Sequence, residues 1–139
     1  MDKILFTVLG CGASGGVPRL GTNWGACDPK NIRNQRLRCS LLVEKKMNSK
    51  KTVALIDTGP DMRQQLLKAK VEDLDGIIYT HSHADHVHGI DDLRMLVYKR
   101  RARLPAYADE TTSKRLKEGF GYIFNQPKGS NYPAILDLK

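Results

Sequence analysis

The chain has 139 residues, 40% of them hydrophobic, which is typical of a single domain with its own core. Its 23 basic and 15 acidic residues give a formal net charge of +8, which favours anionic partners such as phosphate esters, nucleotides or RNA. No apolar stretch is long enough to span a membrane, and segment 4–9 lacks the basic leader of a signal peptide. The three cysteines form no Cys-x-x-Cys pair and fit a reducing compartment. We therefore expect a cytoplasmic protein without membrane contact.

The first predicted element is a strand over residues 3–9, which is rich in β-branched and bulky side chains. It runs into the glycine-rich segment 10–16, whose backbone can adopt positive φ angles and approach a ligand closely. Two interpretations stand side by side: a phosphate-contacting loop with Ser14 as a donor, or a sharp turn at the sheet edge. A dinucleotide-binding fold is not favoured, because Pro18 and Gly21 interrupt the helix that should follow.

A long polar loop is expected over residues 17–35, and loops of this length are usually functional or mobile. Cys11 and Cys39, on either side of it, are expected to be small buried residues. A second strand over 38–44 and a third over 52–57 are predicted to form a hairpin with a turn at 45–51.

The second half of the chain alternates predicted helices and strands. An amphipathic helix is expected over 60–70, with Met62, Leu66 and Leu67 on its apolar face. A strand at 76–79 is followed by a short helix through 93–98 that Asp91 or Asp92 would cap. Later segments complete the pattern, with a strand at 104–108, a helix at 109–118 and the start of a strand at 134–136. The basic run 99–103 is interpreted as a solvated helix end in preference to a phosphate or RNA contact.

All four histidines of the chain fall within residues 79–89, together with one carboxylate. The order His81-x-His83-x-Asp85-His86 supplies four metal-ligating groups from one tight loop. If His81 and His83 point to the same side, they can hold one ion, and Asp85 with His86 can reach a second ion beside it. Paired ions suit hydrolysis, because one activates a water while both stabilise the leaving oxygens. The segment therefore predicts a metal site.

This loop also carries a resemblance. Segment 80–86, Thr-His-Ser-His-Ala-Asp-His, resembles the signature loop of the metallo-β-lactamase-fold hydrolases. Segments 9–19 and 89–94 resemble the phosphoribosyl cyclic phosphate phosphodiesterases within that superfamily. The resemblance implies an α/β (α+β) fold, in which a mixed sheet with helices on one face forms half of a four-layer αββα sandwich. It implies one domain over residues 1–139, truncated after the N-terminal half of the sandwich.

The resemblance also implies roles for individual residues. His81, His83, Asp85 and His86 would ligate two divalent ions, zinc or manganese, and Asp85 would also be a catalytic residue. Asp57, at the tip of the third strand, would accept the far ring N–H of a ligand histidine, an interpretation we favour over a cap for the next helix. No histidine follows His88, so the ligands that the family takes from its second half are missing here.

The function that these observations predict is a metal-dependent phosphodiesterase acting on small cyclic or nucleotide-like phosphodiesters. The missing ligands favour one alternative, a catalytically inactive remnant that self-associates or binds a metal or partner without turnover. Another alternative is a nuclease of the tRNA 3′-processing type, which the basic charge suits but whose usual flexible RNA-gripping arm is not apparent in the sequence. Nucleic acid is thus a partner that is not favoured. Because half a sandwich leaves one sheet face without its partner, we also expect a homodimer.

Overall fold

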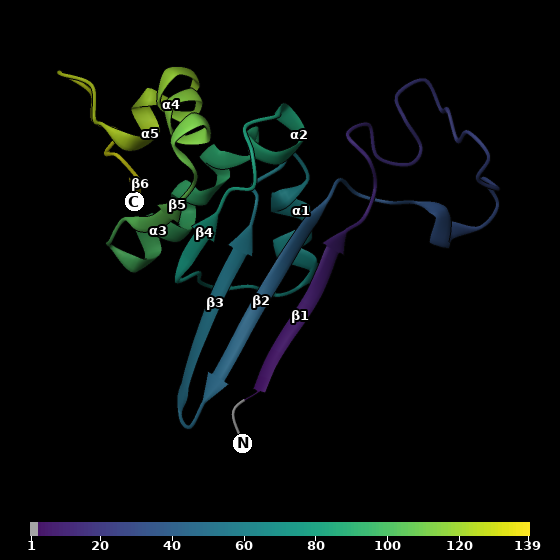
Figure 1. Ribbon diagram of the computed structural model, residues 1–139, viewed down its shortest axis with the longest axis horizontal. Helices are drawn as coiled ribbons and strands as arrows, with labels where there is room; N and C mark the ends of the chain where they lie inside the picture. Colours follow the sequence, from purple (N-terminus) through teal and green to yellow (C-terminus); the bar gives the residue numbers. More distant parts are fainter. Residues whose placement is uncertain (1–2) are drawn as a thin grey trace.

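The computed structural model describes residues 3–139. Its centre is a single six-stranded mixed sheet in which the strands lie side by side in chain order (Figure 1). The strands are β1 (Lys3–Gly10), β2 (Ser40–Met47), β3 (Lys50–Ile56), β4 (Gly76–Ile78), β5 (Leu104–Tyr107) and β6 (Leu136–Leu138). The first three strands pair antiparallel, and β3 to β6 pair parallel. Each parallel connection contains a helix, as parallel pairing requires.

The helices pack on one face of this sheet. They are α1 (Met62–Lys68), α2 (Ala84–Val87), α3 (Arg94–Arg100), α4 (Glu110–Gly119) and α5 (Gly121–Phe124), with 3₁₀ turns η1 (Ile32–Asn34) and η2 (Ile90–Leu93). One continuous cluster of buried apolar side chains joins the sheet to α1, η2, α3, α4 and α5. This arrangement confirms the predicted α+β half-sandwich, a mixed sheet with helices on one face.

The two faces of the sheet differ in what covers them. The strand register aligns Leu42, Leu55 and Ile77 in one row, and all three side chains are buried beneath the helices. The neighbouring row, on the opposite face, runs through Val8 and Ile78 and is largely exposed. Because side chains alternate along a strand, both faces are apolar although only one has a helical layer.

Several boundaries differ from those predicted. β2 begins at Ser40 and extends to Met47, so that the hairpin turn is only Asn48–Ser49. The extension is possible because Lys45, Lys46 and Met47 pair with the start of β3 although their side chains are exposed. Helix α1 begins only at Met62, two residues after Pro60, and β6 lies at Leu136–Leu138, two residues later than expected.

The predicted cap of the helix after the histidine loop is wrong. Asp91 and Asp92 lie inside η2, and neither caps a helix, since η2 follows Gly89 and α3 follows Leu93 without a side-chain cap bond. The turn begins early because the Gly89 amide donates to the carbonyl of Thr58 at 2.7 Å. The Asp91 carboxylate instead accepts a hydrogen bond from Arg94 at 3.0 Å.

The expected burial of three residues is also wrong. Cys11 and Cys39 are exposed, because both lie where the chain passes between the sheet and residues 12–38 and no second layer covers them. Leu67 is exposed on α1. Its place on the buried side of the helix is taken by Gln65, whose Nε2 donates to the Arg38 carbonyl at 2.8 Å.

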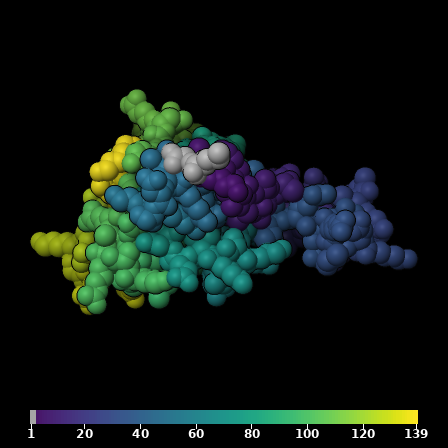
Figure 2. Space-filling view, turned by 90° about the horizontal axis from the view of Figure 1, so that it is seen from below, coloured from purple at the N-terminus to yellow at the C-terminus, as the bar shows by residue number. Residues whose placement is uncertain are grey.

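Residues 12–38, between β1 and β2, form an arm that projects beyond the sheet (Figures 1 and 2). The arm is held by backbone pairing rather than by a core, with bridges Gly12↔Arg38 and Val17↔Arg36 at its base and Arg19↔Asn23 further out. Near its tip, Leu20 is almost fully exposed. The long loop predicted at 17–35 therefore has a defined backbone conformation and projects from the sheet.

Among residues 3–139, no helix is both long enough and apolar enough to cross a membrane.

Candidate metal centre

The histidine loop leaves the carboxyl end of β4, next to the carboxyl end of β3. Since these strands are parallel and pair Ile56 with Ile78, the residues that follow them emerge at the same edge of the sheet. Asp57 follows β3 with a left-handed φ of 63°, and its amide donates to the Ile78 carbonyl at 2.9 Å. This turn directs the Asp57 carboxylate toward the histidine loop.

Asp57 is a buried carboxylate that binds the loop at three points. Its Oδ1 accepts the Thr80 amide at 2.8 Å, and its Oδ2 accepts the Thr80 hydroxyl at 2.7 Å. Its Oδ2 also lies 2.7 Å from Nδ1 of His86. Because an ionised carboxylate only accepts, this contact assigns a proton to Nδ1 of His86, and in the neutral ring the lone pair is then on Nε2. Helix α1 has no side-chain cap bond, so Asp57 does not cap it.

Thr80 extends the same network to a second histidine. Its hydroxyl donates to Asp57, and its oxygen lies 3.0 Å from Nδ1 of His81, from which it can accept a hydrogen bond. The network therefore assigns Nδ1–H to His81 as well as to His86, and in both rings Nε2 is left as the nitrogen able to bind a metal. The sequence-based prediction gives Thr80 no role of its own; the signal that could have identified it is its position between a strand and a predicted ligand, His81.

The structure gathers all four predicted ligands in one place. The centroid of the His81 ring lies 4.7 Å from that of the His83 ring and 4.0 Å from that of the His86 ring. Nε2 of His86 lies 3.3 Å from Oδ2 of Asp85. Imidazole nitrogens and a carboxylate suit a divalent transition metal, so the donor types fit the implied ions.

The number of donors is smaller than a complete centre needs. Within residues 3–139, no group of three or more His, Cys, Asp or Glu side chains is placed to hold one metal ion. His88 does not add to the set: it is exposed, and its ring packs edge-on against Phe120 with the centroids 5.7 Å apart. A metal bound by this loop needs further donors from water, substrate or protein outside these residues.

Two glycines bring the β3 end and the histidine loop into direct backbone contact. A Cβ on Gly59 would overlap the Asp85 carbonyl, and one on Gly89 would overlap the Gly59 carbonyl. The Thr58 amide donates to the His86 carbonyl at 2.8 Å at the same place. Neither glycine is identified by sequence reasoning, because the requirement comes from a contact between segments about 30 residues apart.

A buried tyrosine supports the loop from below. Tyr79, the last residue before Thr80, accepts a hydrogen bond from the Thr58 hydroxyl at 3.1 Å. Burial raises the pKa of the Tyr79 hydroxyl far above its usual range, and the nearby Asp57 carboxylate adds to the shift. Tyr79 is therefore neutral at every physiological pH and acts as packing beneath the site.

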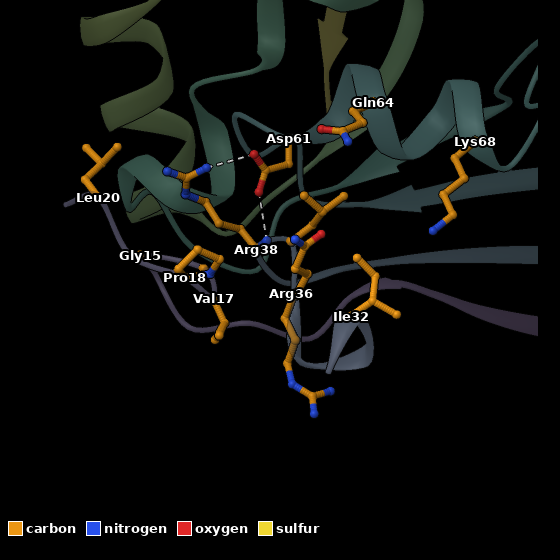
Figure 3. Close-up of a pocket in the computed structure, with 13 residues that line it drawn as sticks. Gly15, Val17, Pro18, Leu20, Ile32, Arg36, Arg38, Asp61, Gln64 and Lys68 are labelled. Carbon is orange, nitrogen blue, oxygen red and sulfur yellow. Dashed lines mark hydrogen bonds and ion pairs between the residues drawn. The ribbon is translucent and has the colours of Figure 1, made fainter. Parts of the chain in front are cut away.

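The glycine-rich segment has a structural explanation. A Cβ on Gly10 would overlap the Arg38 carbonyl, and one on Gly12 would lie 2.9 Å from the Arg36 carbonyl. The segment borders a hollow of about 500 Å³ whose other walls include segment 35–38 and α1 (Figure 3). There the Arg38 guanidinium points at Asp61, 2.8 Å away, and its Nε donates to the Ser14 carbonyl at 2.9 Å. These contacts favour the turn interpretation, with the glycines needed for close packing.

Comparison with known proteins agrees with this fold. Residues 52–136 match the family described as Beta-lactamase superfamily domain. The chain thus belongs to the β-lactamase superfamily and forms the N-terminal region of a metallo-β-lactamase fold.

The individual proteins that this chain resembles are longer than the chain itself. A crystal structure of a diphosphatase from the PhnP family is 37% identical, has a TM-score of 0.81 and matches the whole chain over 51% of its own length. An octanoyltransferase of Porphyromonas gingivalis is 36% identical over 132 residues, covering 95% of this chain and 25% of that protein. The exodeoxyribonuclease YycJ of Bacillus anthracis is 30% identical over 118 residues, or 85% of this chain and 34% of that protein. The chain therefore spans between a quarter and a half of these relatives.

Zinc-bound PqqB from Methylobacterium extorquens shares the fold at 18% identity, with a TM-score of 0.64.

Proposed function

We propose that this chain provides the metal-binding half of a phosphodiesterase that acts on small cyclic or nucleotide-like phosphodiesters. The observation that carries the proposal is the network in which Asp57 fixes His86 while Asp85 lies beside the free Nε2 of that ring. The resemblance of the whole chain to a PhnP-family diphosphatase supports a phosphate ester as the substrate class.

In this proposal, His81, His83, Asp85 and His86 hold two divalent ions, zinc or manganese. Such ions, when bound, supply positive charge that polarises a phosphoryl oxygen and activates water. Asp57 keeps the His86 ring in the metal-binding tautomer, and Asp85 is the carboxylate nearest the reacting atoms. The superfamily supports a metal, while its identity and number are part of the proposal.

Elemental analysis of the purified 139-residue chain, before and after incubation with zinc or manganese, tests the metal centre. We expect metal uptake by the wild type, a loss of at least half of it in His86→Ala, and no loss in His88→Ala, the matched histidine outside the network. Hydrolysis of 2′,3′-cyclic AMP by the metal-loaded chain then tests the reaction. Failure to take up metal under any condition would favour the inactive remnant.

The position of Asp57 allows a more specific test. Asp57→Asn keeps the size of the side chain but removes the carboxylate that accepts from His86 Nδ1. Loss of such a supporting acceptor typically costs about 10- to 100-fold in metal affinity. A zinc titration followed by competition with a chelator measures the change. Unchanged zinc affinity would remove Asp57 from the metal site.

A second candidate function is a nuclease, and the arm favours it. Residues 11–39 contain five basic residues and a single acidic one, Asp28. The projection of the arm at the edge from which the histidine loop also leaves would suit a nucleic-acid backbone (Figure 1). Binding of single-stranded RNA should weaken steeply with salt and weaken further in Arg19→Glu/Arg33→Glu. Lys46→Glu, at the far end of the sheet, is the matched control; an equal loss there would argue against the arm.

The uncovered sheet face supports a homodimer. We propose that a second copy covers the sheet face that carries Phe6, Val8 and Ile78, since apolar sheet faces pack against one another and a twofold axis makes the contact self-complementary. Light scattering on eluted fractions should give a dimer mass for the wild type and a monomer mass for Phe6→Lys. Leu20→Lys, at a still more exposed position on the arm, should remain dimeric. A folded wild-type monomer at low concentration would contradict the proposed homodimer.

The proposal places the chain in the cytoplasm. Its three cysteines are free, which suits a reducing compartment.

A further inference from the structure

A hollow of about 490 Å³ lies beside η2 and the segment that follows α5. Six residues line it: Asp91, Arg94, Tyr122, Pro127, Ser130 and Tyr132. Its size is in the range of sites for small molecules, and its walls combine aromatic rings with a few polar groups. It shares no lining residue with the hollow beside the glycine-rich segment or with the histidine loop.

The polar wall of this hollow is fixed in place. The Arg94 guanidinium donates to Oδ1 of Asp91 at 3.0 Å and to the Pro133 carbonyl at 3.1 Å. Its central carbon lies 5.7 Å from the centroid of the Tyr132 ring, within cation–π range. Arg94 therefore ties η2 to the segment that carries Tyr132 and sets the direction of that ring.

The segment after α5 is also ordered by its own hydrogen bonds. The Ser130 amide donates to the Pro127 carbonyl at 3.0 Å, and the Tyr132 amide donates to the Ser130 hydroxyl at 3.1 Å. The Gln126 side chain donates to the Ser130 carbonyl at 2.5 Å. The wall is thus shaped before any ligand arrives, which lowers the entropy lost on binding.

The aromatic surfaces of the hollow are open to solvent. Tyr122 is 44% exposed and Tyr132 is 67% exposed, although Ile123 and Phe124, next to Tyr122, are buried. Exposed tyrosines beside a fixed arginine form the kind of surface on which flat nucleobases stack. The Asp91 carboxylate keeps more than half of its surface exposed and can accept a hydrogen bond from a base amino group.

The hollow and the histidine loop lie close together along the chain. The chain reaches Asp91 three residues after His88, and the His88 ring packs against Phe120, which precedes Tyr122 by two residues. We propose that the hollow binds the nucleobase of a nucleotide-like substrate whose phosphodiester lies at the histidine loop. The proposal rests on the phosphodiesterase function and narrows its substrate class to nucleotides.

Binding without turnover tests this separately from catalysis. The metal-free 139-residue chain is titrated with adenosine 5′-monophosphate and, in parallel, with ribose 5-phosphate, which has the same sugar phosphate but no base. We expect tighter binding of the nucleotide, with NMR shifts concentrated at Tyr122 and Tyr132. Tyr132→Ala and Tyr122→Ala should each weaken nucleotide binding by about tenfold and leave ribose 5-phosphate unchanged.

Tyr107→Ala is the matched control, because Tyr107 is a comparably exposed tyrosine on the uncovered sheet face. It should bind the nucleotide as the wild type does, and circular dichroism confirms that each variant is folded. Equal affinity for the two ligands, or an equal loss in Tyr107→Ala, would overturn the base site. Neither result depends on hydrolysis, so the phosphodiesterase proposal would stand or fall on its own test.

Discussion

The two faces of the sheet are built from similar residues, but helices cover one face and leave the other exposed to solvent. One row of paired residues, at most 2% exposed, crosses four strands beneath the helices: Leu42, Leu55, Ile77 and Ala106. The adjacent row on the other face crosses five strands: Val8, Leu41, Ile56, Ile78 and Tyr107. In that row Val8 remains 65% exposed.

The difference shows that apolar character alone does not define a core. A monomer rarely leaves so continuous an apolar surface in water, and such surfaces mark contact with another layer of protein. The helix-covered face therefore supplies the buried core of the chain, and the uncovered face is the surface on which we propose the second copy to pack.

The largest expected effect on stability comes from making a cavity in the core beneath the covered face. Leu55→Ala removes a fully buried side chain at the centre of the sheet and leaves a cavity. Unfolding in urea, followed by circular dichroism at fixed protein concentration, should show a loss of about 2–5 kcal/mol. A loss below about 1 kcal/mol would mean either that the helices move in to fill the cavity or that their packing on the sheet contributes little to the unfolding free energy.

A somewhat smaller effect is expected where the covered face meets the histidine loop. In Gly59→Ala the new methyl group would overlap the Asp85 carbonyl, so the backbone must shift. We expect about 1–3 kcal/mol of destabilisation, together with weaker zinc binding. Gly119→Ala is the control, since a Cβ at Gly119 meets nothing within 4 Å. If both variants lost a comparable amount of stability, the destabilisation of Gly59→Ala could not be attributed to the contact with the histidine loop.

The helical layer also has a pH-dependent anchor. Asp109 caps α4, and the hydrogen bond from the Thr112 amide lowers the pKa of the Asp109 carboxyl below its usual value. Because the folded-state pKa is the lower one, the stability from this carboxylate is present above the unfolded pKa and is lost as pH falls through the folded pKa. Asp109→Asn should retain stability near neutrality, since asparagine is also a good cap.

Urea unfolding between pH 7 and pH 3 measures the contribution of Asp109. The wild type should lose more stability than Asp109→Asn over that range. Parallel curves for the two proteins would show that acid destabilises the helical layer through other carboxylates.

The smallest expected effect is on the uncovered face. Val8→Ala removes an exposed side chain and should change the unfolding free energy of the monomer by no more than about 0.5 kcal/mol. The same urea experiment, at a concentration where light scattering shows monomer, gives the comparison with Leu55→Ala. A loss as large as that of Leu55→Ala would show that the two faces are equally important within one chain.

Sequence patterns predicted the helices and strands better than the contacts between them. The six strands and the grouping of the histidines follow from short-range signals, namely β-branched runs and the spacing from His81 to His86. The ligand roles themselves remain predictions. The contacts of Thr80, Gly59 and Gly89 could not be predicted, because they depend on β3 and the loop after β4 meeting in space.

Burial was harder to predict than secondary structure. Cys11 and Cys39 have a residue type that is usually buried, yet both are exposed where the chain passes between the sheet and the arm. The arm over residues 12–38 was predicted as a loop, while its direction depends on backbone bridges such as Val17↔Arg36. Nothing in local composition sets such a pairing.

The order of strands across the sheet has a consequence for biosynthesis. Every strand lies beside the one made just before it, so β2 can pair as soon as it leaves the ribosome and each later strand finds a free edge already waiting. No strand must be inserted between two that have already paired. The sheet can therefore grow from one side at the pace of translation, while the outer edge of β1 stays free throughout.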